Sequence, residues 1–135
     1  MKDTLTAGLT ATRRFTVDKD STIDFMGDEL RVYATPSLVR DIEITCRDFL
    51  LEHVDDGEDS VGTRVEIDHM APTLLGMWAD ISITVAEVKG PLVIFEFTGQ
   101  DPTDQIAKGR HIRFVSDVAK TAQRLQAKAD KAAEG

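Results

Sequence analysis

Residues 35–54 read TPSLVRDIEITCRDFLLEHV, and this stretch decides the fold. Apolar side chains recur in it at helical spacing over a wide arc, with Leu38 and Ile42 on one line. Most of the charged side chains lie on the other side of the helix, but Ile44 and Leu51 interrupt that polar face. The spacing therefore predicts a helix over residues 35–54 that other parts of the protein cover on more than one side.

The start of this helix is marked by Thr35 and Pro36. Threonine is a preferred N-cap, and Pro36 then falls at the first helical position, where its missing N–H costs nothing. The same hydroxyl would lie beside backbone N–H groups that stabilise developing negative charge. Capping and oxyanion binding are both open roles for Thr35.

The rest of the chain favours strands. A short strand is predicted before the helix over 12–17, and four follow it over 61–67, 78–88, 92–97 and 106–115. Turn signals such as Gly90-Pro91 predict that the four later strands pair in succession as antiparallel hairpins. Residues 117–134 are rich in alanine and lysine and predict a final helix.

These elements predict an α+β protein in which an antiparallel sheet wraps around one long central helix. One domain over residues 1–135 is expected, with its core over about 12–116 and the C-terminal helix over 117–134. The apolar flank of the central helix would be covered most easily by a second copy of the chain. A homodimer is therefore expected.

Composition narrows the possible partners. The 135 residues include 24 acidic and 16 basic side chains, a net charge of −8 that argues against a nucleic-acid partner. No apolar run approaches the roughly 18 residues of a membrane-spanning helix. The single cysteine, Cys46, excludes an intrachain disulfide, and the three scattered histidines argue against a metal site. A cytoplasmic protein is expected.

Two further polar residues stand where folding alone would not place them. Glu43 falls at the edge of the apolar arc, where a carboxylate loses hydration and is suited to act as a general base. The alternative is a surface ion pair with Arg47, four residues on. His69 ends an alternating strand at a corner, where site residues concentrate. Its alternative is an ordinary surface or core histidine, and His111 on the last strand leaves the same choice open.

The order and spacing of four short motifs resemble one family over about residues 15–125. The motifs are Ala34-Thr35-Pro36 with Glu43 eight residues after Thr35, Ser60-Val61-Gly62-Thr63, His69 with Ala71-Pro72-Thr73 and Gly76, and Gly109-x-His111-x-Arg113. Together they resemble the hot-dog-fold thioesterases similar to fluoroacetyl-CoA thioesterase.

This resemblance implies hydrolysis of a small acyl-CoA thioester by a homodimer with active sites near the subunit interface. It implies Thr35, Glu43 and His69 as the catalytic set. Gly62 and Thr63 would pack near the acyl thioester, and Pro36 is expected to join them in binding substrate. No cofactor or metal is expected, because CoA is part of the substrate. Glu43 would activate water as a general base or attack the acyl carbon itself.

Three other functions stay open at this point. A non-catalytic module that binds acyl-CoA or a related small ligand could use the same fold, and so could an acyl-CoA hydratase. The hydratase is less favoured because the usual Asp and His five residues apart are missing, while the adjacent Asp68 and His69 would point to opposite strand faces. A purely structural or interaction protein is the third.

Overall fold

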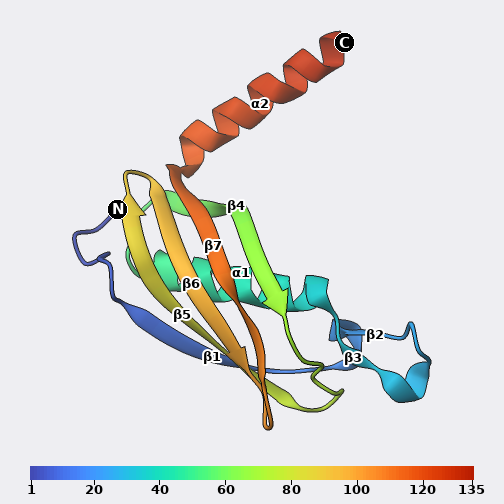
Figure 1. The fold of residues 1–135 in the computed structure, drawn as a ribbon. Helices are drawn as coiled ribbons and strands as arrows, with labels where there is room; N and C mark the ends of the chain where they lie inside the picture. The colour runs from blue at the N-terminus through green and yellow to red at the C-terminus, as the bar shows by residue number, and fades with distance from the viewer.

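The computed structural model describes all 135 residues and contains one five-stranded antiparallel sheet with a long helix against one face (Figure 1). The strands of this sheet lie in the order β1-β5-β6-β7-β4. Their bounds are β1 Thr10–Thr16, β4 Glu58–His69, β5 Trp78–Lys89, β6 Leu92–Gln100 and β7 Gln105–Asp117. The sheet curves around helix α1, Thr35–Leu51, which is the hot-dog arrangement expected from the sequence.

One part of the predicted pairing is wrong. Strands β5, β6 and β7 form the expected hairpins, but β4 pairs with β7 at one edge and β1 with β5 at the other. The reason is the connection over residues 70–77, which crosses the end of the sheet and does not turn back. Met70 N–H donates to the Ile106 carbonyl at 2.7 Å, and Gly76 N–H donates to the Val17 carbonyl at 2.8 Å. The segment thereby runs from the β7 side of the sheet to the end of β1.

The core lies between α1 and the inner face of the sheet. Leu38, Ile42 and Cys46 of α1 are buried against alternating strand residues such as Ile83 and Phe95. Burial of each such apolar side chain stabilises the fold by roughly 1.5–3 kcal/mol. Burial also raises the pKa of the Cys46 thiol to about 12, so this cysteine is a structural group of the core.

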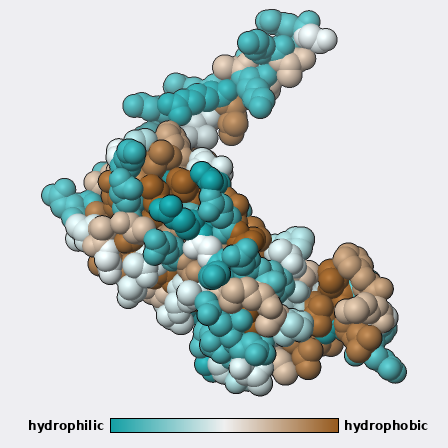
Figure 2. Space-filling model, in the orientation of Figure 1, coloured by the Kyte–Doolittle hydropathy of each residue, from teal (hydrophilic) through white to brown (hydrophobic).

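A short flap precedes α1 and forms an apolar corner of the surface (Figure 2). It consists of β2 Thr22–Ile23, the 3-10 turn Asp28–Leu30 and β3 Val32–Tyr33, with a second 3-10 turn, Lys19–Ser21, before it. Large apolar side chains of the flap and of the 70–77 connection are exposed and surround a hollow of about 380 Å³; they are Met26, Leu30, Leu74 and Leu75. The flap leads directly into the first turn of α1.

Helix α2, Val118–Glu134, follows β7 without a linker and projects away from the sheet (Figure 1). The Asp117 side chain caps it by accepting a hydrogen bond from Lys120 N–H at 3.0 Å. None of its residues is buried. Neither α1 nor α2 is long and apolar enough to span a membrane.

Candidate active site

The start of α1 meets the end of β4 through Thr35 and His69. The Thr35 Oγ1 and His69 Nδ1 atoms lie 2.7 Å apart, a hydrogen-bond distance. The predicted N-cap role of Thr35 is wrong: Ala34 is the N-cap, and Thr35 already has its place in the helix. Ala34, the residue directly before the helix, is held by its backbone N–H, which donates to the Ser21 carbonyl at 2.8 Å. The Thr35 hydroxyl therefore forms a hydrogen bond with His69 and does not cap the helix.

His69 is poised to interact with a further polar group. Its Nε2 atom is buried and has no hydrogen-bond partner within the chain. Burial lowers the pKa of His69 below the usual histidine value, so the ring is neutral near pH 7. An open surface hollow of about 270 Å³ lies next to the pair; the residues that line it are Ile23, Val32, Tyr33, Thr35, His69, Met70, Ala71 and Pro72. It is large enough to admit a small acyl group.

Glu43 belongs to a second cluster, two turns further along α1. Its carboxylate Oε2 lies 3.6 Å from Arg113 NH1 of β7, and its side chain is 42% exposed. The alternative pairing with Arg47 is wrong, because Arg47 donates to Asp59 of β4 at 2.7 Å. Glu43 therefore faces the sheet and is not part of the surface charge of the helix.

The rest of this second cluster comes from β4 and β7. Arg113 is held by Ser60 and lies 3.2 Å from His111 Nε2. Gly62 lies beside Glu43, since a Cβ atom placed at Gly62 would be 3.3 Å from Glu43 Oε2. The neighbouring Thr63 hydroxyl donates to the Ile112 carbonyl at 3.2 Å, so the structure separates these two predicted substrate-binding residues.

Within one chain, the two clusters do not meet. Eight residues separate Thr35 from Glu43, and at about 1.5 Å per residue the helix places them about 12 Å apart along its axis. Pro36 is exposed in the first turn beside Thr35. The structure thus joins Thr35 to His69, and Glu43 to Gly62, but leaves the two halves of the predicted catalytic set apart.

Sequence reasoning missed the residues that support these two clusters. Ser60 was noted only as part of a motif, and the contact of Tyr33 with Asp41 was not expected at all. The Tyr33 hydroxyl donates to the Asp41 carboxylate, which fixes β3 against α1 two residues before Thr35. Strand alternation could not have revealed Ser60. A register shift between Gly62 and Arg64 places Ser60 on the inward face together with Ile67, whereas simple alternation assigns these two residues to opposite faces.

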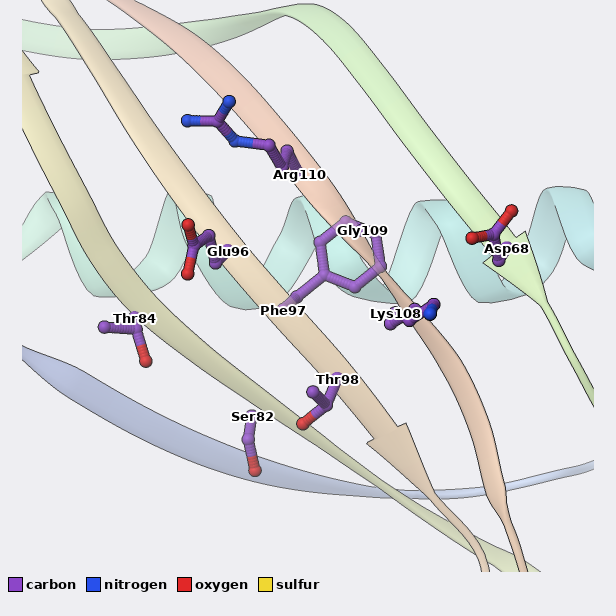
Figure 3. A pocket seen from close by; sticks show the side chains of 9 residues that line it. All are labelled: Asp68, Ser82, Thr84, Glu96, Phe97, Thr98, Lys108, Gly109 and Arg110. Atoms are coloured by element: carbon purple, nitrogen blue, oxygen red, sulfur yellow. The ribbon is translucent and has the colours of Figure 1, made fainter.

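The largest hollow of the surface lies elsewhere. It measures about 420 Å³ and occupies the outer face of the sheet, with α1 behind the strands in this view (Figure 3). Lys108, Arg110, Glu96 and Asp68 line it, and none of them forms a salt bridge within the chain. Asp68 and His69 point to opposite faces of β4, as the alternation predicts, so this hollow is not connected to the Thr35–His69 pair.

Comparison with known proteins identifies the family of this chain. Residues 17–119 match the family described as fluoroacetyl-CoA-specific thioesterase. The chain belongs to this family. The resemblance inferred from the four sequence motifs is thereby confirmed.

Members of the thioesterase family and its structural neighbours cover almost the whole chain. The fluoroacetyl-CoA thioesterase of Streptantibioticus cattleyicolor is 27% identical over 127 residues, which span 89% of this chain and 91% of the relative. A crystal structure of fluoroacetyl-CoA thioesterase superposes with a TM-score of 0.83 at 24% identity, covering 92% of this chain and 97% of the other. A thioesterase-superfamily protein of Thermus thermophilus superposes with a TM-score of 0.87 at 24% identity, over 96% and 97% of the two chains.

Proposed function

We propose that this protein hydrolyses the thioester of a small acyl-CoA to the free acid and CoA, with Thr35, Glu43 and His69 as its catalytic residues. The observation that carries this proposal is the 2.7 Å hydrogen bond between Thr35 and His69 at the start of α1, beside an open surface hollow of acyl size. Membership of the thioesterase family supports it, and so does a relative whose variant was crystallised with fluoroacetate and CoA. Nothing observed favours the non-catalytic binding module.

The chemistry follows from the three side chains. Water adds to the thioester carbonyl, the C–S bond breaks, and the CoA thiolate leaves and takes up a proton. Glu43 either removes the proton from water or attacks the carbonyl first to give an anhydride that water opens. His69, neutral at pH 7, orients the water or carries the proton to sulfur. Thr35 and the first N–H groups of α1 stabilise the oxyanion.

The distance between the two clusters supports a site shared by two copies of the chain. If two α1 helices pack side by side in antiparallel order, the Thr35–His69 pair of one copy faces Glu43 of the other. Strand β4 supports the same assembly. It is a 12-residue edge strand of the sheet, and the side of it that faces away from β7 pairs with no other strand of the chain. A homodimer of this kind would also cover the flank of α1 that carries the half-exposed Ile44.

The remaining parts of the proposal concern the surroundings of the reaction. Gly62 would border the acyl group, with Thr63 and Pro36 nearby as further substrate-binding residues. The chain would act as a single domain and would need no cofactor or metal, because CoA arrives as part of the substrate. A cytoplasmic location is part of the same proposal, since the one cysteine is a buried free thiol and no disulfide is required.

The test measures thiol release from short, branched and aromatic acyl-CoAs by the purified protein and by Glu43→Gln. The wild-type protein should turn over at least one class of substrate, and Glu43→Gln should lose roughly 100-fold or more in kcat while its melting temperature is kept. Glu52→Gln is the matched control, because Glu52 is exposed at the end of the same helix. Full activity in Glu43→Gln would overturn the assignment of the residue. Ligand-induced stabilisation without any turnover would point to the binding module.

A further inference from the structure

We infer that Arg113, clamped by Ser60 and His111, is a positioning residue that orients the Glu43 carboxylate for the reaction. This inference rests on the proposed function, because it assigns Arg113 a role that acts through Glu43. The contacts around the Arg113 guanidinium carry the argument, and burial explains why those contacts are needed.

Arg113 is the most enclosed of the charged side chains that form ion pairs in this structure. Its side chain is 5% exposed, and the only carboxylate within 4 Å is that of Glu43. An isolated buried guanidinium is strongly destabilising, whereas one with a carboxylate partner and saturated hydrogen bonds is tolerated. Pairing with Glu43 therefore stabilises the buried charge of Arg113, although the two residues lie on different elements.

The guanidinium is fixed from the side that faces away from Glu43. Arg113 Nε donates to the Ser60 hydroxyl at 2.8 Å, and NH2 donates to the Ser60 carbonyl at 2.9 Å. These two bonds use adjacent donors of the planar fork, which sets its orientation as well as its place. A lysine at this position would keep the charge but could not make both bonds to Ser60.

His111 completes the clamp in a defined tautomer. Its Nδ1 lies 2.8 Å from the Arg64 carbonyl, which can only accept, so Nδ1 carries the proton and donates. Nε2 is then the acceptor, and Arg113 NH1 donates to it at 3.2 Å. Burial lowers the pKa of His111, which keeps the ring neutral and preserves that lone pair. His111 therefore supports Arg113 and is not free to exchange protons with substrate.

The contact with Glu43 has the length that a positioning role requires. At 3.6 Å it is an ion pair but too long for a hydrogen bond, so the carboxylate oxygens stay free to accept a proton or to attack. The Cβ position of Gly62 lies 3.3 Å from Glu43 Oε2 and 3.5 Å from Arg113 NH1. Arg113 thus holds Glu43 beside Gly62, where β4 has no side chain to fill the space.

The experiment compares Arg113→Lys, Arg113→Gln and Ser60→Ala with Arg47→Gln, a control that removes the rejected partner of Glu43. Arg113→Lys and Ser60→Ala should lower kcat about tenfold with KM changed by less than about twofold, because orientation is lost while substrate contacts remain. Arg113→Gln removes the charge as well as the planar fork, so it should lower kcat at least as much as Arg113→Lys.

The outcomes separate this inference from the proposed function. If Glu43→Gln is inactive but all three Ser60 and Arg113 variants keep wild-type kcat, Glu43 is catalytic and the positioning role of Arg113 is wrong. If Arg113→Gln does not fold, the folded Ser60→Ala and Arg113→Lys decide by their kcat. A loss of kcat in Arg47→Gln equal to that in Arg113→Lys would also overturn the inference.

Discussion

Two histidines of this chain, His69 and His111, differ from a surface histidine in one physical respect: burial lowers the pKa of each. His69 ends β4 and meets Thr35, whereas His111 lies in the middle of β7 and is fully buried. A depressed histidine pKa means that the unfolded chain binds protons more readily than the folded one. Stability is then fully present above the unfolded pKa of about 6.5 and is lost as the pH falls below it.

This difference predicts the pH dependence of stability. The free energy of unfolding should fall between pH 7.5 and pH 5.5, with His111 contributing up to about 1.4 kcal/mol per pH unit below pH 6.5. Urea denaturation at a series of pH values measures it. His111→Gln should flatten the slope of this free energy against pH, because the group with the lowered pKa is then absent. An unchanged slope in His111→Gln would show that another group causes the pH dependence.

At the scale of elements, the junction of β4 and β7 positions both clusters, and Gly109 allows it to form. Gly109 of β7 pairs with Ile67 of β4 and with Phe97 of β6. A Cβ atom at Gly109 would lie 1.9 Å from the Glu66 carbonyl oxygen and 2.7 Å from Phe97 Cζ. The first of these is a backbone atom, so the strands themselves would have to separate.

Gly109→Ala should therefore destabilise the protein by about 3 kcal/mol or more, because relief of the clash disturbs β4 as well as β7. Thermal or urea denaturation measures the change. Lys108→Ala, one residue away and exposed, should stay within about 0.5 kcal/mol of wild type. If Gly109→Ala were as stable as Lys108→Ala, the close approach of the two strands would not exist in the folded protein.

At the scale of the whole molecule, the main feature is the distance between the two parts of the proposed catalytic set. Thr35 and His69 lie at one end of α1 and Glu43 lies about 12 Å along it, a separation set by the helix rise. A side chain cannot span this distance, but a two-fold axis between antiparallel helices can remove it. Under the proposed function, the dimer is therefore needed for the reaction as well as for covering the helix.

Complementation between inactive variants tests this shared site. Glu43→Gln and His69→Ala should each be inactive alone, yet a refolded equimolar mixture should recover about one quarter of wild-type activity. Half of the dimers in the mixture are mixed, and each mixed dimer has one intact site built from both chains. No recovery, with mixed dimers demonstrated by mass spectrometry of a tagged chain, would place all three groups in one subunit.

The sequence alone determined the local elements and predicted which residues would carry the chemistry. The helical spacing after Thr35 and the alternation along β5, β6 and β7 predicted these elements, because period and turn chemistry are local properties of a chain. The four spaced motifs placed Thr35, Glu43 and His69 together in one family set. Glu43 was separated from the helix charges by its angular position alone.

Only the tertiary structure decided which groups meet. The edge position of β4, the loss of the capping role of Thr35 and the choice of Arg113 over Arg47 as partner of Glu43 all depend on contacts between residues far apart in the chain. Arg47 was an equally good partner on the helix surface. Arg47 pairs with Asp59 of β4 because β4 lies beside α1 in the folded protein. Helical and strand periods fix which face a side chain occupies, but what lies opposite that face is set by the packing of the whole chain.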